Sequence, residues 1–282
     1  MKKGLVLEGG AMRGMFTCGV IDVLMENNIT FDGLVGVSAG AVFGCNYKSR
    51  QIGRGIRYNM NYCNNKEYVS LWSLRHTGDI YGVDFAYRKI PYELDIFDVD
   101  TFKNNPMEFY SVSTDMNKGT PIYTKLDNGD EKDILWLRAS ASMPVVSRPV
   151  LIDDLELSDG GTTDSIPLEF LISKGYNKNV VVLTQPQGYI KKKMKHSFYI
   201  NHKLKKYPKM VEALKIRPKM YNDQVNFVKE KEKEGSAFVI RPPYDLKIGS
   251  ICHDKNELKR VYDIGRKTML DNLDKLIKFL ND

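Results

Sequence analysis

Short apolar segments that alternate with helical patterns constrain the fold more than any other feature of this chain. Strands are predicted at residues 4–9, 31–38, 107–116, 119–126, 179–186 and 236–243. Residues 149–161 are predicted to form either a hairpin or a strand with a bend at Asp153–Asp154. Helices are predicted at residues 13–26, 39–50, 131–140, 166–175 and 258–280. Apolar strands that alternate with helices are typical of a parallel sheet covered on both faces. The pattern therefore predicts an α/β fold with a mainly parallel central sheet.

The chain shows no boundary between domains. It contains no internal repeat, low-complexity run or proline-rich linker, so we expect a single domain over residues 1–282. Residues 191–233 carry 14 Lys and Arg against four Asp and Glu, whereas the whole chain has a formal net charge of +7. We expect residues 187–235 to form a basic helical insertion or cap. Such a segment fits either an anionic membrane surface or a solvated helical face.

The composition limits the cellular compartment. No apolar run approaches the roughly 20 residues that span a bilayer, and the first ten residues lack the apolar core of about 7–15 residues of a signal peptide. The four cysteines are scattered, at Cys18, Cys45, Cys63 and Cys252. They form no CxxC pair, which disfavours a zinc site or a disulfide framework. We expect a cytoplasmic protein with reduced thiols, in peripheral contact with the membrane if the basic segment docks there.

A glycine-rich bend, "LEGGAMRG", joins the first predicted strand to the first helix. Such a bend directs unpaired backbone N–H groups at a negative group, which is either a cofactor phosphate or an oxyanion formed during a reaction. The dinucleotide fingerprint GxGxxG requires a glycine where Ala11 stands, and it requires an acid at the end of the second strand. No GK[ST] of a P-loop follows either. The sequence therefore disfavours a nucleotide cofactor.

The second predicted strand ends in Gly36-Val-Ser38-Ala-Gly40, which matches the GxSxG nucleophile elbow. The sharp strand-to-helix turn needs small residues beside the serine, and the helix that follows directs its positive dipole end at the serine oxygen. If the first two strands are neighbours, the glycine-rich bend lies next to Ser38. Its N–H groups would then form an oxyanion hole.

The identity of the catalytic base remains open at this point. The order Ser38, Asp159, His253 would satisfy an α/β-hydrolase triad, although His253 falls in an unassigned loop. Asp159 directly follows a predicted strand, and Gly160 and Gly161 allow a tight turn that exposes its carboxylate. A carboxylate held against a hydroxyl in a shielded site can serve as the only base.

Four motifs in order resemble the patatin-like phospholipases. They are the bend from Gly9 to Gly14, GxSxG, the segment "ASASMP" (Ala139–Pro144) and Asp-Gly-Gly at 159–161. The later "RPKMYNDQ" and "FVIRPP" are similar to the C-terminal region of bacterial members. The resemblance implies a three-layer α/β/α sandwich that cleaves lipid acyl esters without a metal or cofactor.

The resemblance also implies roles for individual residues. Ser38 would be the nucleophile and Asp159 the base, with no histidine. The oxyanion hole would comprise Gly9, Gly10 and Ala11, with Arg13 in support, and the N–H of Ala39 would contribute. Gly14, Gly36, Gly40 and Gly160 would support the motifs. Glu8 and Ala11 depart from the aspartate and glycine usual in the family, and alanine would add strain if a positive φ is required.

Other functions stay open beside lipid ester hydrolysis. An acyltransferase would share the acyl-enzyme but use another acceptor, and a lipid-binding or regulatory protein would have little turnover. Nucleic-acid binding is least favoured because the basic segment matches no recognised module. Residues 51–105 have no clear assignment, and we expect their tyrosines, at positions 58, 62, 68 and 81, to help line a substrate channel.

Overall fold

Eight strands form one mixed sheet in residues 1–192 and 197–282, which the computed structural model describes. The strands are β1 (Lys2–Leu7), β2 (Gly33–Val37), β3 (Glu108–Asp115), β4 (Thr120–Lys125), β5 (Val150–Ile152), β6 (Leu155–Asp159), β7 (Tyr176–Val182) and β8 (Ala237–Ile240). Their order is β5-β6-β3-β2-β1-β7-β8, with β4 also paired to β3. β1, β2, β3, β7 and β8 pair in parallel, whereas β4 and β6 run antiparallel to β3. The prediction of a mainly parallel sheet is confirmed.

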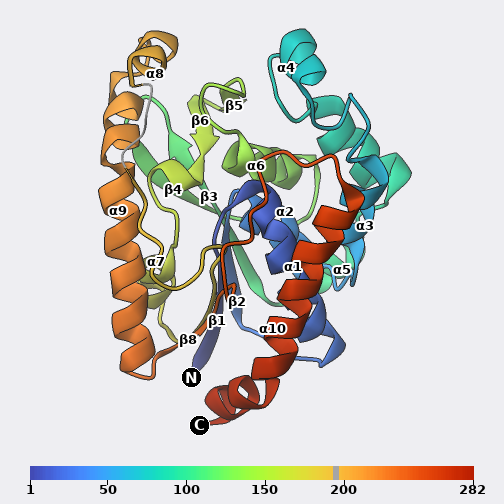
Figure 1. Cartoon of the computed structure of the whole chain (residues 1–282), viewed down its shortest axis with the longest axis vertical. Coiled ribbons are helices and arrows are strands. Elements are labelled where there is room, and N and C mark those ends of the chain that lie inside the picture. Colours follow the sequence, from blue (N-terminus) through green and yellow to red (C-terminus); the bar gives the residue numbers. More distant parts are fainter. Residues whose placement is uncertain (193–196) are drawn as a thin grey trace.

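Helices cover both faces of this sheet (Figure 1). The helices are α1 (Gly14–Glu26), α2 (Ala39–Lys48), α3 (Arg54–Tyr62), α4 (Leu71–Thr77), α5 (Val99–Asn104), α6 (Glu131–Ala141), α7 (Leu168–Ser173), α8 (Ser197–Lys203), α9 (Pro208–Lys233) and α10 (Lys255–Asn281). α1, α2, α3 and α10 pack together on one face, and α7 and α9 lie on the other. The arrangement is a three-layer α/β/α sandwich.

The side chains of the central strands fill both hydrophobic cores, because successive side chains of a strand point to opposite faces of the sheet. On β1, Leu5 and Leu7 pack in the core with α1 and α2, whereas Val6 packs in the core with α7 and α9. Residues 180–182 of β7 divide between the two cores in the same way. Since both faces are buried, the central strands need apolar residues at every position, which explains the continuous apolar segments.

The pairing along β3 brings two distant segments together. β2 pairs in parallel with β3 as far as Val37, which lies opposite Val112. β6 then pairs antiparallel with the next residues of β3, and Asp159 lies opposite Ser113. Because β4 occupies the other edge of β3 along this stretch, β6 uses the edge that β2 leaves free. The end of β6 therefore meets the end of β2, where Ser38 follows.

Residues 51–105 form α3, α4, a π-helix at Phe85–Leu94 and α5. Each of these helices has ten residues or fewer, so each spans about three turns or fewer and carries too few repeats for its apolar periodicity to be recognised. α4 lies at the end of the molecule toward which the parallel strands run, as does α8 (Figure 1).

The predicted insertion at 187–235 contains α8 and α9. α9 packs against β8 and against the short 3₁₀ helix Gly160–Thr162, so it belongs to the second helical layer. None of the described helices combines the length and apolar character that a membrane-spanning helix requires.

Candidate active site

Ser38 lies on the sharp turn between β2 and α2. Its φ of 54° and ψ of −124° are costly for a residue other than glycine. A Cβ on Gly36 would lie 2.6 Å from the Ala41 Cα, and one on Gly40 would lie 2.3 Å from the Leu7 carbonyl oxygen. Both glycines are therefore required by close backbone packing, which is the structural context of a nucleophile elbow.

Asp159, the last residue of β6, contacts Ser38 directly. The Ser38 Oγ donates a hydrogen bond of 2.7 Å to one carboxylate oxygen of Asp159. The Gly161 N–H donates one of 2.8 Å to the other oxygen. A Cβ on Gly160 would lie 2.1 Å from the Val112 carbonyl oxygen, so the chain passes directly over β3 at this turn. The Asp-Gly-Gly motif thus places and orients the carboxylate.

The Asp159 carboxyl is buried, and burial raises its pKa. The hydrogen bond from Ser38, the positive charge of Arg217 and the N–H of Gly161 act in the opposite direction. A carboxylate with a raised pKa is a stronger base toward the serine proton than a solvated one.

The histidines lie elsewhere in the described part of the chain. His253 is exposed and its Nδ1 hydrogen-bonds with the backbone carbonyl of Cys63. His76 pairs with the carbonyl of Trp72, and His202 is exposed on α8. The fourth, His196, lies outside the described residues. The two pockets that meet at Ser38 have no histidine among their described lining residues.

The glycine-rich bend lies beside Ser38, because β1 and β2 are neighbours as predicted. A Cβ on Gly9 would lie 2.9 Å from the Ser38 Cβ. The backbone N–H groups of Gly10 and Ala11 donate no hydrogen bond to any described residue, and both residues line the pocket at Ser38. Ala11 has a φ of 48°, so the strained conformation considered for alanine does occur.

Contacts at both ends hold the bend. Glu8 is buried, and its two carboxylate oxygens accept from the Thr184 N–H at 2.6 Å and from the Tyr221 hydroxyl at 2.8 Å. Burial raises the Glu8 pKa, and these bonds oppose the rise. At the other end, a Cβ on Gly14 would lie 2.6 Å from the Phe43 ring. Glu8 thus connects the bend to the end of β7 and to α9.

Ser140, in the segment Ala139–Pro144, supports the elbow from α6. Its buried Oγ accepts a hydrogen bond of 2.9 Å from the Ser38 N–H and donates one of 2.6 Å to the Val112 carbonyl oxygen. This hydrogen bond occupies the backbone N–H of Ser38.

Two pockets meet at Ser38, Ala11 and Met143. The first pocket is mainly apolar and aromatic. Its lining includes Met12, Val42, Phe43, Tyr58, Tyr68, Tyr81, Tyr87, Ile90, Phe97, Ile134 and Leu137. Three of the four predicted tyrosines are therefore in this lining, but Tyr62 is not. Tyr62 instead packs edge-on against Phe85, with ring centroids 5.3 Å apart.

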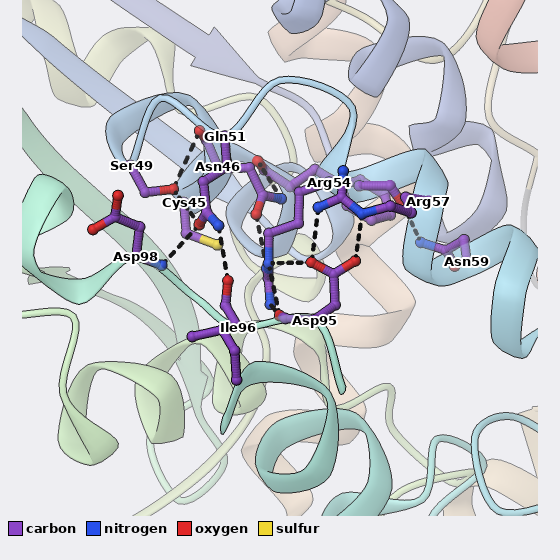
Figure 2. Close-up of polar contacts among 12 residues, drawn as sticks. Cys45, Asn46, Ser49, Gln51, Arg54, Arg57, Asn59, Asp95, Ile96 and Asp98 are labelled. Carbon is purple, nitrogen blue, oxygen red and sulfur yellow. Dashed lines mark hydrogen bonds and ion pairs between the residues drawn. The ribbon is translucent and has the colours of Figure 1, made fainter. Parts of the chain in front are cut away.

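Arg54 is the one charged residue in the described lining of the first pocket, and its guanidinium is fully engaged (Figure 2). It donates to the Asn46 side chain at 2.8 Å and to the Asp95 carbonyl at 2.7 Å, and its Nε lies 3.3 Å from an Asp95 carboxylate oxygen. The same carboxylate pairs with Arg57 at 2.8 Å. Because these protein groups accept the hydrogen bonds of Arg54 and its charge is paired with Asp95, the first pocket remains suited to an apolar group.

The second pocket is polar and charged. Its lining includes Glu8, Arg13, Asp159, Thr162, Ser165, Lys191, Arg217 and Tyr221. No group of three or more His, Cys, Asp or Glu side chains in the described part of the chain is arranged to hold a metal ion.

Several residues of this site were not found by reading the sequence. Ser140 was part of a recognised segment, but its contact with the Ser38 N–H depends on how α6 packs against β3. Lys191 was visible only as a member of a basic segment. Arg217 and Tyr221 lie in the quoted segment "RPKMYNDQ", but the resemblance gave neither of them a role. Thr184 carried no signal, because it belongs to no motif and acts through a buried side chain, Glu8.

Comparison with known proteins identifies the class. A family model described as patatin-like phospholipase matches residues 5–172, more than half of the chain. The chain therefore belongs to the patatin-like phospholipases, a family of lipid acyl hydrolases. A second model, described as a domain of unknown function (DUF6363), matches residues 207–281.

Two individual proteins and one solved structure are also similar to this chain. YjjU of Escherichia coli (strain K12) is 25% identical, over 93% of this chain and 74% of that protein. Lysophospholipase nte1 of Aspergillus terreus is also 25% identical, over 97% of this chain but only 18% of its own length. The crystal structure of VipD from Legionella pneumophila aligns with a TM-score of 0.48 at 12% identity, covering 97% of this chain and 67% of VipD.

Proposed function

We propose that this protein is a serine hydrolase of lipid acyl esters in which Ser38 is the nucleophile and Asp159 the base. One observation carries the proposal: the Ser38 Oγ, held on a strained turn, donates a hydrogen bond of 2.7 Å to a buried carboxylate. A nucleophile within hydrogen-bond reach of its base is the arrangement that this chemistry needs. The family and the similarity to a lysophospholipase support a lipid ester as substrate.

The reaction follows from these positions. Asp159 accepts the Ser38 proton as the Oγ attacks the ester carbonyl carbon. The resulting oxyanion accepts hydrogen bonds from the N–H groups of Gly10, Ala11 and Ala39. The bond to the alcohol oxygen then breaks, and that oxygen takes the proton from Asp159. Water attacks the acyl-enzyme, gives a proton to Asp159 and releases the fatty acid, and the proton returns to Ser38.

The two pockets would hold the two halves of the ester. An acyl chain fits the apolar and aromatic lining of the first pocket, and the alcohol half then lies in the second. This division follows from the position of Ser38 in the lining of both.

We also propose peripheral contact with an anionic membrane at the end of the molecule that bears α4 and α8. Phe198 on α8 is 86% exposed and Leu71 on α4 is 76% exposed. Lys203, the last residue of α8, and Lys205, which follows the helix, are also exposed. Exposed apolar side chains with flanking lysines are the combination that binds lipid interfaces.

Labelling with a fluorophosphonate probe tests the proposed dyad. We expect covalent modification at Ser38, lost in Ser38→Ala, reduced by several orders of magnitude in Asp159→Asn and retained in His253→Ala. Loss of labelling in His253→Ala would favour the triad instead. A folded wild-type protein that is not labelled would favour a lipid-binding role, and acyl transfer to added alcohols that outruns hydrolysis would favour an acyltransferase.

A further inference from the structure

Three cationic side chains line the second pocket beside Ser38 and come from three segments of the chain. Arg13 lies at the end of the glycine-rich bend, Lys191 follows β7, and Arg217 lies on α9. Burial and the positive charges of Arg217 and Arg13 lower the pKa of Lys191 to about 8. Glu8 and Asp159 act on this pKa in the opposite direction. Since like charges within a pocket disfavour one another, a bound anion would stabilise the three cations further.

None of the three cations forms an ion pair with a described residue. The Arg13 Nε is buried and has no hydrogen-bond partner among the described residues. The Arg217 Nε donates to the Gly161 carbonyl, and this leaves its terminal nitrogens for another partner. Arg54 in the neighbouring pocket is different, because the protein itself supplies all of its contacts.

Lys191 is held in place by its surroundings. Its backbone N–H donates to the Asn222 side chain at 2.9 Å, and its carbonyl accepts from the same side chain at 3.1 Å. Its Nζ lies 4.5 Å from the centre of the Tyr221 ring. These contacts attach the loop to α9 and orient Lys191, while no described residue accepts a hydrogen bond from its ammonium group.

The carboxylates in this pocket do not balance the cations. Glu8 and Asp159 are the two acids in the described lining, and burial raises the pKa of both. Each already accepts two hydrogen bonds from the protein. The pocket therefore carries a net positive charge even when both acids are ionised.

We propose that Arg13, Lys191 and Arg217 bind a phosphate monoester on the alcohol half of the substrate, so that the enzyme prefers acyl esters of a phosphorylated alcohol. The inference rests on the proposed function, which places the alcohol half in this pocket. A phosphate monoester carries close to two negative charges at neutral pH, and arginine and lysine are its usual ligands. A phosphate capped by a quaternary ammonium would bring a positive charge toward the same cations and is disfavoured.

Substrates that share one acyl chain test this preference. Wild-type protein and the variant Lys191→Gln are compared on 1-acylglycerol 3-phosphate, 1-acylglycerophosphocholine and 1-acylglycerol. Each lost contact to a charged group is worth about 1.5–3 kcal/mol, so Lys191→Gln should lower kcat/KM for the phosphate monoester about ten- to a hundredfold. The values for the other two esters should change far less. The exposed neighbour Lys192→Gln is the matched control and should leave all three values unchanged.

Equal losses on all three esters would overturn the inference, because they would show that Lys191 serves only the catalytic groups. Binding of glycerol 3-phosphate to Ser38→Ala, measured by calorimetry, separates this inference from the proposed function. Binding that is lost in the double variant with Lys191→Gln supports the site even if no ester is hydrolysed. If inorganic phosphate binds as tightly as glycerol 3-phosphate and wild type shows no preference among the esters, the pocket is a free-phosphate site and the inference fails.

Discussion

Ala11 shows how one backbone angle affects the proposed oxyanion hole. It occupies the left-handed region with a φ of 48°, which costs about 1–2 kcal/mol for a residue with a Cβ. Ala11→Gly removes this strain. It also increases the conformational entropy of the unfolded chain, which lowers the free energy of unfolding by about 0.4–1 kcal/mol. We therefore expect the melting temperature to stay the same or rise slightly and kcat to stay close to wild type, because the N–H is unchanged.

Ala11→Val is the informative comparison, since a β-branched residue adopts a positive φ with greater strain. The bend should then move, and the loss of one oxyanion donor costs about 10²–10³ in kcat. Thermal unfolding and ester hydrolysis measured on both variants check this. A valine variant as active as wild type would show that the Ala11 N–H does not contact the oxyanion.

The pH dependence of activity should report the ionisation of Asp159. Burial raises its pKa, and the charge of Arg217 partly opposes this rise. Since the proposed base must be ionised to accept a proton, kcat/KM should fall as the pH drops through this pKa. Arg217→Gln removes a neighbouring positive charge, so the acid limb of the profile should move to higher pH. An unchanged limb in this variant would mean that another group controls it.

The raised pKa of Asp159 also affects the stability of the fold. A carboxyl whose folded-state pKa is raised stabilises the fold only while it is protonated, and this contribution is lost as the pH rises through the folded pKa. Ionised Asp159 therefore costs stability at neutral pH. We expect Asp159→Asn to melt at the same temperature as wild type or higher while losing activity, and a large drop in melting temperature would contradict this.

α6 contacts the nucleophile turn through the Ser140 hydroxyl. Ser140→Ala would leave the Ser38 N–H and the Val112 carbonyl without their shared partner, and an unsatisfied buried group costs about 1–3 kcal/mol. We expect lower stability together with a lower kcat, because the elbow loses a contact that orients it.

Ser142→Ala provides the control from the end of the same helix. The Ser142 hydroxyl donates only to the Arg138 carbonyl, and its backbone carbonyl, which accepts from the Asp159 N–H, is kept. Denaturant unfolding and steady-state kinetics of both variants distinguish the two roles. Equal effects would show that Ser140 has no special part in orienting Ser38.

The net charge of the whole molecule predicts that its binding to lipid vesicles depends on their charge. The chain has a formal net charge of +7, and exposed lysines accompany the apolar side chains of α8. We expect co-sedimentation with vesicles that increases with their anionic lipid content and weakens as salt screens the charges. Phe198→Ser should weaken binding to these vesicles. Leu270→Ser should not, although it also replaces an exposed apolar side chain by serine, because Leu270 lies on α10. Binding that does not depend on the anionic lipid content of the vesicles would contradict the proposed membrane contact at this end.

The sequence was sufficient where a feature depends on neighbouring residues. The glycine-rich bend and the GxSxG turn are local, because small residues and tight backbone angles act over about five positions. The mainly parallel sheet was equally accessible, since strands buried on both faces must be apolar throughout. Residues 51–105 could not be assigned from the sequence, because their helices are too short to show an apolar periodicity.

Contacts between distant segments required the folded chain. Ser38 and Asp159 are 121 residues apart, and they meet because β6 pairs with β3 where β2 ends. Ser140, Tyr221 and the cations Lys191 and Arg217 reach the site through the packing of α6 and α9. Such contacts follow from strand register and helix packing, which depend on the summed burial of many side chains. The pairing of Ser38 with Asp159 was expected only because their motifs resemble those of a known family, and the other contacts were not expected at all.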